Sequence, residues 1–231
     1  MVIIEKVYHW LADHYQDGDR IFLFRFSRGA YQVRALAGMI QKLGLIFPGN
    51  IGLIPFACEL YANRHRGKGK RTLGPTLSEI FKHTFSRQVK VHFVGVWDTV
   101  ASVGLIQKSP LPLTTTAHHI CTFRHGLALD EHRVKFLPTY LAEVWFVESH
   151  SDVGRSNDPH ALSLGLVPLL WMENQAIDTG LRCRPRSFFG DWTWDSLHKN
   201  RPTISLRSFW RLLEVLPIMR YQYTDPNATT R

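Results

Sequence analysis

Residues 24–30 read Phe24-Arg25-Phe26-Ser27-Arg28-Gly29-Ala30, and the segments on either side of them decide the fold. Ahead of them, the apolar run of residues 21–24 follows a Gly-Asp turn, which predicts a short buried strand. Behind them, apolar residues recur at helical spacing over residues 30–40, which predicts a helix. Ser27 is therefore expected at a sharp turn from strand to helix.

A serine at such a turn is typical of a nucleophile elbow. The turn lifts the hydroxyl above the sheet, and the helix N-terminus supplies amide donors and a positive dipole end. An ordinary N-cap serine is the alternative. The usual pattern G-x-S-x-G is also incomplete, because Arg25 stands where the first glycine belongs. Ser27 is thus a candidate nucleophile on this segment, with the capping role left open.

The composition is that of an ordinary globular chain with a positive net charge. The 231 residues predict one domain, with 45% hydrophobic and 20% charged residues. The net charge of +9 favours anionic partners such as a phospholipid surface. Three scattered cysteines predict neither a disulfide framework nor a zinc site. No signal peptide and no apolar run of about 18 residues is visible, so we expect a cytoplasmic protein.

Three further helices are expected from the pattern. The first covers residues 2–15, and its apolar face would consist of Ile3, Val7, Trp10 and Leu11. The other two cover residues 56–64 and 77–85. Between them, residues 64–71 form a basic, glycine-punctuated loop, which is either a solvated surface segment or a contact for phosphate groups. Aromatic residues do not alternate with these charges, so a nucleic-acid partner is not expected.

Residues 117–129 are expected to form a helix that carries His118, His119 and His125. Adjacent His118 and His119 would point in different directions on a helix, which argues against a metal site.

Two more strands are expected to end at ionisable residues. Residues 89–100 are rich in β-branched residues and predict a central strand, and Asp98 falls at its carboxyl end. Residues 144–147 predict another strand, after which a loop presents His150. Site residues gather at the carboxyl edge of open parallel sheets. Ser27, Asp98 and His150 also follow the chain order of α/β-hydrolase triads. Asp98 as a turn cap and Asp152 as the acid remain alternatives.

Several blocks together resemble one family, the α/β-hydrolase domain shared by type VI secretion phospholipase effectors and many fungal proteins. Residues 21–31 resemble its G-F-S-R-G-A-Y elbow, and residues 93–100 its F-V-G-V-W-D-T-V block. Residues 124–131 resemble R-H-A-L-A-L-D-E, and residues 144–154 resemble V-W-F-x-G-x-H-S-D-V-G-G. With residues 166–172, the resemblance covers roughly residues 1–185.

The resemblance implies a serine esterase or phospholipase with a mostly parallel sheet flanked by helices. Ser27 would be the nucleophile, His150 the base and Asp98 the acid, and the Arg28 amide would contribute to the oxyanion hole. No cofactor or metal is expected. The substrate would be an ester or phospholipid, with peripheral contact to an anionic membrane surface.

Departures from the family pattern favour a weak enzyme or a catalytically degenerate interaction module. Arg25, Glu148 and Arg155 occupy positions that are usually glycine in the family. Arg25 would either push the elbow helix outward or send its guanidinium to solvent, where it could also bind a phosphate. Family members begin with a strand ending in D-G-T, and none is visible here. We therefore expect the sheet to lack that first strand and the chain to be truncated at its N-terminus.

The domain organisation follows from where the resemblance ends. Residues 1–185 would form the α/β-hydrolase-like domain. Residues 186–223 would be an aromatic-rich extension packed on it, with a membrane-facing surface as the alternative. Residues 224–231 would be a disordered tail.

Overall fold

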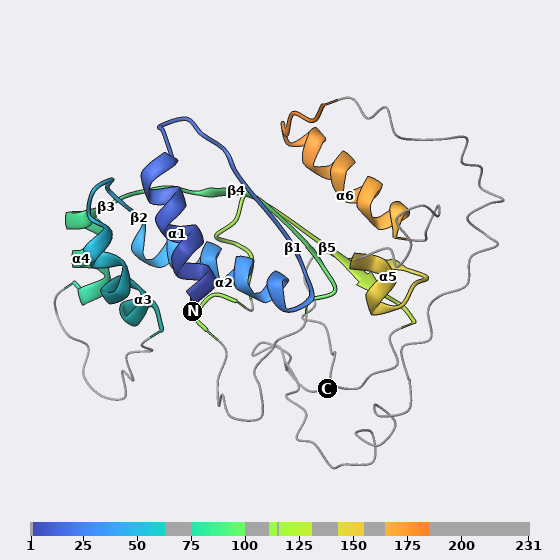
Figure 1. The fold of residues 1–231 in the computed structure, drawn as a ribbon, viewed down its shortest axis with the longest axis horizontal. Coiled ribbons are helices and arrows are strands. Elements are labelled where there is room, and N and C mark those ends of the chain that lie inside the picture. Colours follow the sequence, from blue (N-terminus) through green and yellow to red (C-terminus); the bar gives the residue numbers. More distant parts are fainter. Residues whose placement is uncertain are drawn as a thin grey trace, which may run out of the picture.

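The centre of the protein is a four-stranded parallel sheet. The computed structural model describes residues 2–62, 75–99, 111–114, 116–130, 143–154 and 165–184. The strands follow the order β1-β4-β5-β6, with bounds Ile21–Phe26, Val91–Trp97, Thr122–Ala128 and Glu143–Phe146. Every neighbouring pair is parallel. The carboxyl ends of all four strands therefore meet at one edge of the sheet (Figure 1).

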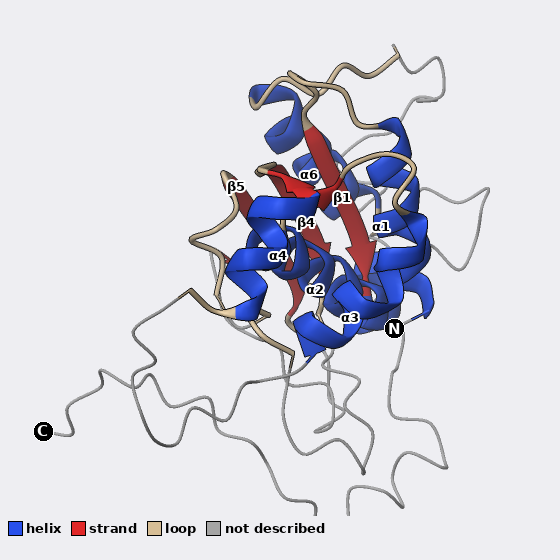
Figure 2. Cartoon of the chain, turned by 90° about the vertical axis from the view of Figure 1, so that its left-hand side faces the viewer, coloured by secondary structure: helices blue, strands red, loops and turns tan. Residues whose placement is uncertain are grey.

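Helices flank this sheet on both faces. Figures 1 and 2 show α1 to α4 gathered on one side of the sheet and α6 on the other. The remaining elements have these bounds: α1 Val2–His14, α2 Ser27–Leu43, β2 Leu45–Ile46, η1 Ile51–Leu53, α3 Ile54–Ala62, α4 Leu77–Phe85, β3 Ser86–Arg87, α5 His150–Gly154 and α6 Leu166–Asp178. The short strands β2 and β3 pair antiparallel as a separate ribbon.

Side chains along the strands point alternately to the two faces of the sheet, which divides the core into two parts. On β1, Ile21 and Leu23 belong to the larger core beneath α1 and α2, whereas Phe22 and Phe24 pack with Phe93 and α6. On β4, Gly95 lies directly under α6. A Cβ there would come within 2.6 Å of the Met172 sulfur. The missing side chain lets α6 approach the sheet closely.

The buried face of α1 differs from the one expected. Ile4, Tyr8, Leu11 and Ala12 are buried, whereas Ile3 and Trp10 are 50% and 59% exposed. A prediction of the buried face from apolar residues alone left out Tyr8. This tyrosine can be buried because its hydroxyl has hydrogen-bond partners in the core. It donates to the Gly44 carbonyl oxygen at 2.9 Å and accepts from the Ile46 amide at 3.2 Å. A satisfied hydroxyl can be buried at little cost.

The helix expected over residues 117–129 is wrong. Residues 122–128 form β5, which pairs with β4 on one side and β6 on the other. A parallel strand covered on both faces loses the alternation that identifies a half-exposed strand. Its apolar residues can then imitate helical spacing over a short window.

The other expected elements agree with the structure within a few residues. Helix α4 has the predicted bounds, and α3 runs over Ile54–Ala62 instead of residues 56–64. Among the described residues, β1 is an edge strand of the four-stranded sheet. The basic loop at residues 64–71, the extension at 186–223 and the tail at 224–231 lie outside the described residues.

Candidate active site

Ser27 lies where β1 passes directly into α2. Its backbone φ is +56°, a left-handed value that is uncommon for a non-glycine residue and costs about 1–3 kcal/mol. The cap position before α2 is taken by Phe26, which makes no side-chain capping hydrogen bond. Ser27 is therefore not the N-cap serine that the sequence left open. Its hydroxyl is half-buried above the sheet edge.

Asp98 follows directly after β4, the strand next to β1. Its side chain is 2% exposed, and its φ of +40° is again left-handed. The Asp98 amide donates to the Gly126 carbonyl oxygen at 2.8 Å, which ties the turn to β5. This turn brings the Asp98 carboxylate to the edge of the sheet where Ser27 lies.

His150 joins these two residues, although it is 52 and 123 positions away from them in sequence. It is the first residue of the short helix α5, where a loop was expected, and it is 6% exposed. The distance from His150 Nδ1 to Asp98 Oδ2 is 2.5 Å, and that from His150 Nε2 to Ser27 Oγ is 2.9 Å. Hydroxyl, imidazole and carboxylate thus form a continuous chain. Such a chain can accept the hydroxyl proton and stabilise the imidazolium that results.

Asp152, the alternative acid, has a different partner. Its Oδ2 accepts a hydrogen bond from the Ser149 hydroxyl at 2.8 Å and a longer one from the Ser149 amide at 3.4 Å. These bonds close the turn at the start of α5 and help to fix the helix that begins with His150. The geometry therefore favours Asp98 over Asp152 as the partner of the imidazole.

The start of α2 places Arg28 beside Ser27. The first four amides of an α-helix have no acceptor within the helix, and they carry the positive end of its dipole. The Arg28 amide is one of this group, while its side chain is exposed. An anion that forms at Ser27 would meet this amide, so the expectation for Arg28 stays a prediction consistent with its position.

Comparison with known proteins adds the family to this geometry. A family model described as "T6SS, Phospholipase effector Tle1-like, catalytic domain" matches residues 2–175. The chain belongs to this family. It is also 40% identical over 135 residues to Uncharacterized protein YEL023C of Saccharomyces cerevisiae (strain ATCC 204508 / S288c). That match covers 57% of this chain and 20% of the relative, so it spans about a fifth of the yeast protein's length. No solved structure matches the chain.

Arg25 departs from the glycine that usually stands at this position of the Tle1-like pattern. Its side chain is exposed, and its aliphatic stem lies against Gly29 on the first turn of α2. A Cβ on Gly29 would come within 3.3 Å of Arg25 Cδ. The absent side chain of Gly29 therefore leaves room for the stem. Of the two expected outcomes, the structure shows the exposed side chain.

Glu148 is the second departure, and it is buried in the segment that leads to His150. The side chain is 2% exposed, and its Oε2 has no hydrogen-bond partner in the described part of the chain. Burial, with a smaller contribution from the charge of Asp152, raises the pKa of Glu148 to about 8. The carboxyl is therefore largely neutral at neutral pH. Arg155, the third departure, lies outside the described residues.

Phe26 is a residue of this site that the sequence reasoning missed. Its ring centroid lies 4.5 Å from that of His150, at an interplanar angle of 37°. The ring therefore covers one face of the imidazole. The only signal in the sequence is an aromatic residue directly before Ser27 in the elbow.

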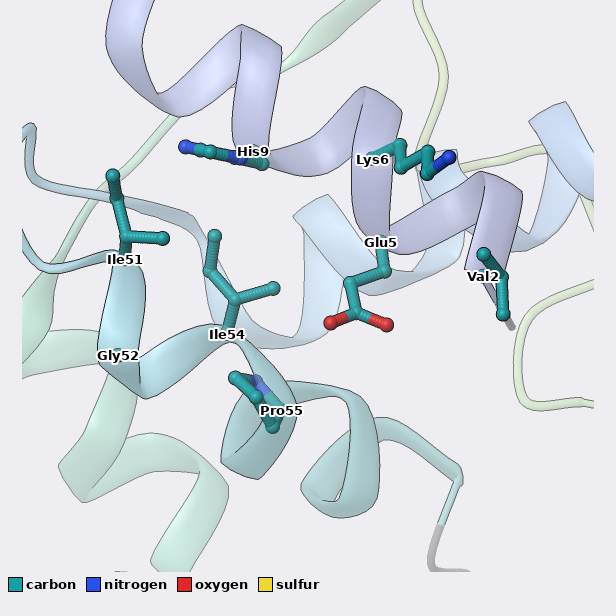
Figure 3. A pocket seen from close by; sticks show the side chains of 8 residues that line it. All are labelled: Val2, Glu5, Lys6, His9, Ile51, Gly52, Ile54 and Pro55. Carbon is teal, nitrogen blue, oxygen red and sulfur yellow. The ribbon is translucent and has the colours of Figure 1, made fainter.

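A surface hollow of about 300 Å³ lies elsewhere, between the N-terminal half of α1 and the start of α3. Figure 3 shows His9 and Glu5 of α1 on the side of the apolar residues Ile51 and Ile54, whereas the Lys6 side chain extends away from them. None of its eight lining residues belongs to the candidate site. In the described ranges, no helix is long and apolar enough to cross a membrane, and no three His, Cys, Asp or Glu residues are grouped to hold a metal ion.

Proposed function

We propose that this Tle1-like domain is a serine hydrolase of esterase or phospholipase type, with an α/β-hydrolase-like arrangement of its sheet. The observation that carries the proposal is the chain of contacts from Ser27 Oγ through His150 to Asp98, at 2.9 Å and 2.5 Å. Membership of a family named for a phospholipase effector supports a lipid ester as the substrate class.

In the proposed reaction, Ser27 Oγ attacks the ester carbonyl carbon while His150 Nε2 takes the hydroxyl proton. Asp98 accepts a hydrogen bond from His150 Nδ1 and stabilises the imidazolium. The carbonyl oxygen becomes an oxyanion and accepts a hydrogen bond from the Arg28 amide at the start of α2. His150 then returns the proton to the leaving alcohol as the carbon–oxygen bond breaks. Water, activated by the same imidazole, releases the acid and restores Ser27.

The membrane is the proposed place of action. The net charge of +9 attracts the chain to anionic lipid surfaces. Hydrolysis of vesicles that contain phosphatidylglycerol is therefore expected to exceed hydrolysis of pure phosphatidylcholine vesicles, and added salt should reduce the difference.

The test combines active-site labelling with turnover. Wild type should react covalently with a fluorophosphonate probe, hydrolyse a short p-nitrophenyl ester and release fatty acid from vesicles. Ser27→Ala should lose all three activities and keep its circular dichroism spectrum. Ser78→Ala, on α4 away from the site, is the matched control and should keep them. Labelling and turnover that persist in pure Ser27→Ala would refute the assignment of the nucleophile.

A catalytically degenerate interaction module is the second candidate. The observation that favours it is Glu148, a buried acid close to His150 at a position that is glycine in the family pattern. This candidate predicts a folded wild type that neither reacts with the probe nor turns over either ester. Labelling of Ser27 in the wild type would exclude it.

A further inference from the structure

The turn that carries Asp98 is held by two hydrogen bonds from backbone amides to β5. The Asp98 amide donates to the Gly126 carbonyl oxygen at 2.8 Å, which continues the ladder between the two strands. The next amide, that of Thr99, donates instead to the side chain of His125, at 3.1 Å from Nε2. His125 and Thr99 are 0% and 1% exposed. A buried imidazole therefore takes the place of a backbone acceptor at this turn.

The backbone geometry explains why a side chain is needed there. Extended pairing ends at Asp98, where φ is +40°, so the Thr99 amide no longer points along the ladder. A buried amide without an acceptor is unfavourable, because it gives up its hydrogen bond to water and gains none in the fold. His125 lies opposite Val96 in the register of β4 and β5, within reach of this amide. The imidazole thus compensates for the loss of regular pairing that the Asp98 turn causes.

The direction of this hydrogen bond fixes the protonation state of the imidazole. A backbone N–H can only donate, so His125 Nε2 must carry no proton. The neutral ring then has its proton on Nδ1. If Nε2 were also protonated, two donors would face each other and the Thr99 amide would lose its acceptor.

We propose that His125 is a positioning residue for the candidate triad: its neutral imidazole holds the Thr99 amide and so keeps Asp98 in the left-handed conformation that directs its carboxylate to His150. The role of Asp98 in catalysis rests on the proposed function. The hydrogen bond by which His125 holds the turn does not depend on that function.

The proposal gives the protein a second histidine whose protonation affects the site. Three elements that neighbour β5 carry charged residues close to this strand. Glu143 stands at the paired position on β6, Asp98 lies at the end of β4, and the Arg34 guanidinium of α2 reaches β5 over the Phe123 ring. A proton on Nε2 would leave the Thr99 amide without its acceptor and so release the Asp98 turn.

Two substitutions separate the hydrogen bond from the packing. His125→Gln keeps an acceptor at a similar reach but does not titrate, whereas His125→Leu removes the acceptor. The matched controls are His92→Gln and His92→Leu. His92 is a histidine on β4 whose Nε2 lies 2.9 Å from the Thr179 carbonyl oxygen, on the side of α6.

The first readout needs no substrate. The His150 Nδ1 proton, shared with Asp98, should give a low-field resonance in the proton NMR spectrum of the full chain. We expect this resonance to persist in His125→Gln and in both His92 variants, and to disappear in His125→Leu. In wild type, nitrogen-15 spectra of labelled histidine should show the His125 proton on Nδ1.

The second readout is kcat and KM for turnover of a short activated ester. A shift near 1 Å at reacting groups costs about 10²-fold in rate, so kcat of His125→Leu should fall by about that factor with KM unchanged. His125→Gln should stay within about fivefold of wild type.

Several results would overturn the proposal. They are a proton on His125 Nε2 in wild type, a persistent low-field resonance in folded His125→Leu, or equal losses in the two folded His125 variants. If His125→Leu does not fold, loss of the resonance in folded His125→Gln overturns it. A wild type that shows the resonance but no turnover refutes the proposed function alone, and the NMR comparison still decides the role of His125.

Discussion

Replacing Glu148 with glutamine is expected to stabilise the fold, and the gain should grow as the pH rises. The Glu148 carboxyl is buried in the segment between β6 and His150, and its Oε2 has no hydrogen-bond partner among the described residues. Burial, and secondarily the charge of Asp152, raises its pKa to about 8. Glutamine has nearly the same shape as the protonated acid and cannot ionise.

The magnitude follows from the two pKa values. In the unfolded chain the carboxyl ionises with its ordinary pKa of 4.5, whereas in the fold it stays protonated up to a pKa of about 8. Between these values the unfolded state binds fewer protons, so stability falls as the pH rises and levels off above pH 8. Within that window, each pH unit lowers the free energy of unfolding by about 1.4 kcal/mol. Between pH 5 and pH 8, wild type should therefore lose about 3–4 kcal/mol that Glu148→Gln keeps.

Urea unfolding at pH 5, 6.5 and 8 measures this difference. The advantage of Glu148→Gln in the free energy of unfolding should be small at pH 5 and reach a few kcal/mol at pH 8. Glu59→Gln is the matched control, because it makes the same chemical change at a residue that is exposed on α3. An advantage of Glu148→Gln that is the same at all three pH values, or absent at pH 8, would refute the reasoning.

Three further predictions concern the site. Asp98→Asn should lower kcat by about 10⁴-fold on an activated ester, because the imidazole is held in the wrong tautomer; full activity in Asp98→Asn together with loss in Asp152→Asn would transfer the acid role. Arg25→Gly should change kcat/KM on neutral esters by less than about threefold, because the side chain is exposed; a large gain would mean that it strains the elbow after all, and a selective loss on anionic vesicles would identify it as a phosphate contact. Gly154→Ala should lower the free energy of unfolding by about 1–3 kcal/mol, because its Cβ would overlap the Phe26 ring; unchanged unfolding by urea would contradict this.

Local pattern was enough to predict which residues lie at the ends of strands. The apolar runs before Ser27, Asp98 and His150 are short and bounded by turn residues, and each corresponds to β1, β4 or β6. Strand ends can be predicted locally, because a buried strand needs a run of apolar residues and turn residues mark the point where that run stops. That the three strand ends share one edge then follows from parallel pairing, which the sequence order of the motifs indicated.

Other features were decided by partners distant in sequence. The sequence did not reveal β5 as a strand, because burial on both faces removes its alternation. It also misplaced the buried face of α1, because the partners of the Tyr8 hydroxyl come from the segment after α2. The burial of Glu148 and the stem of Arg25 against Gly29 likewise depend on packing between elements.

The sequence by itself thus determined the strands that precede Ser27, Asp98 and His150, and the family to which the chain belongs, whereas it did not reveal helix α5, which begins with His150. Only the tertiary structure decided the distances between the three side chains, the exposed path of Arg25 and the use of His125 as an acceptor for the Asp98 turn. The physical reason is one of range. Strand and helix signals reside in neighbouring residues, whereas a hydrogen bond across 26, 52 or 123 positions exists only after the sheet has brought its strands together.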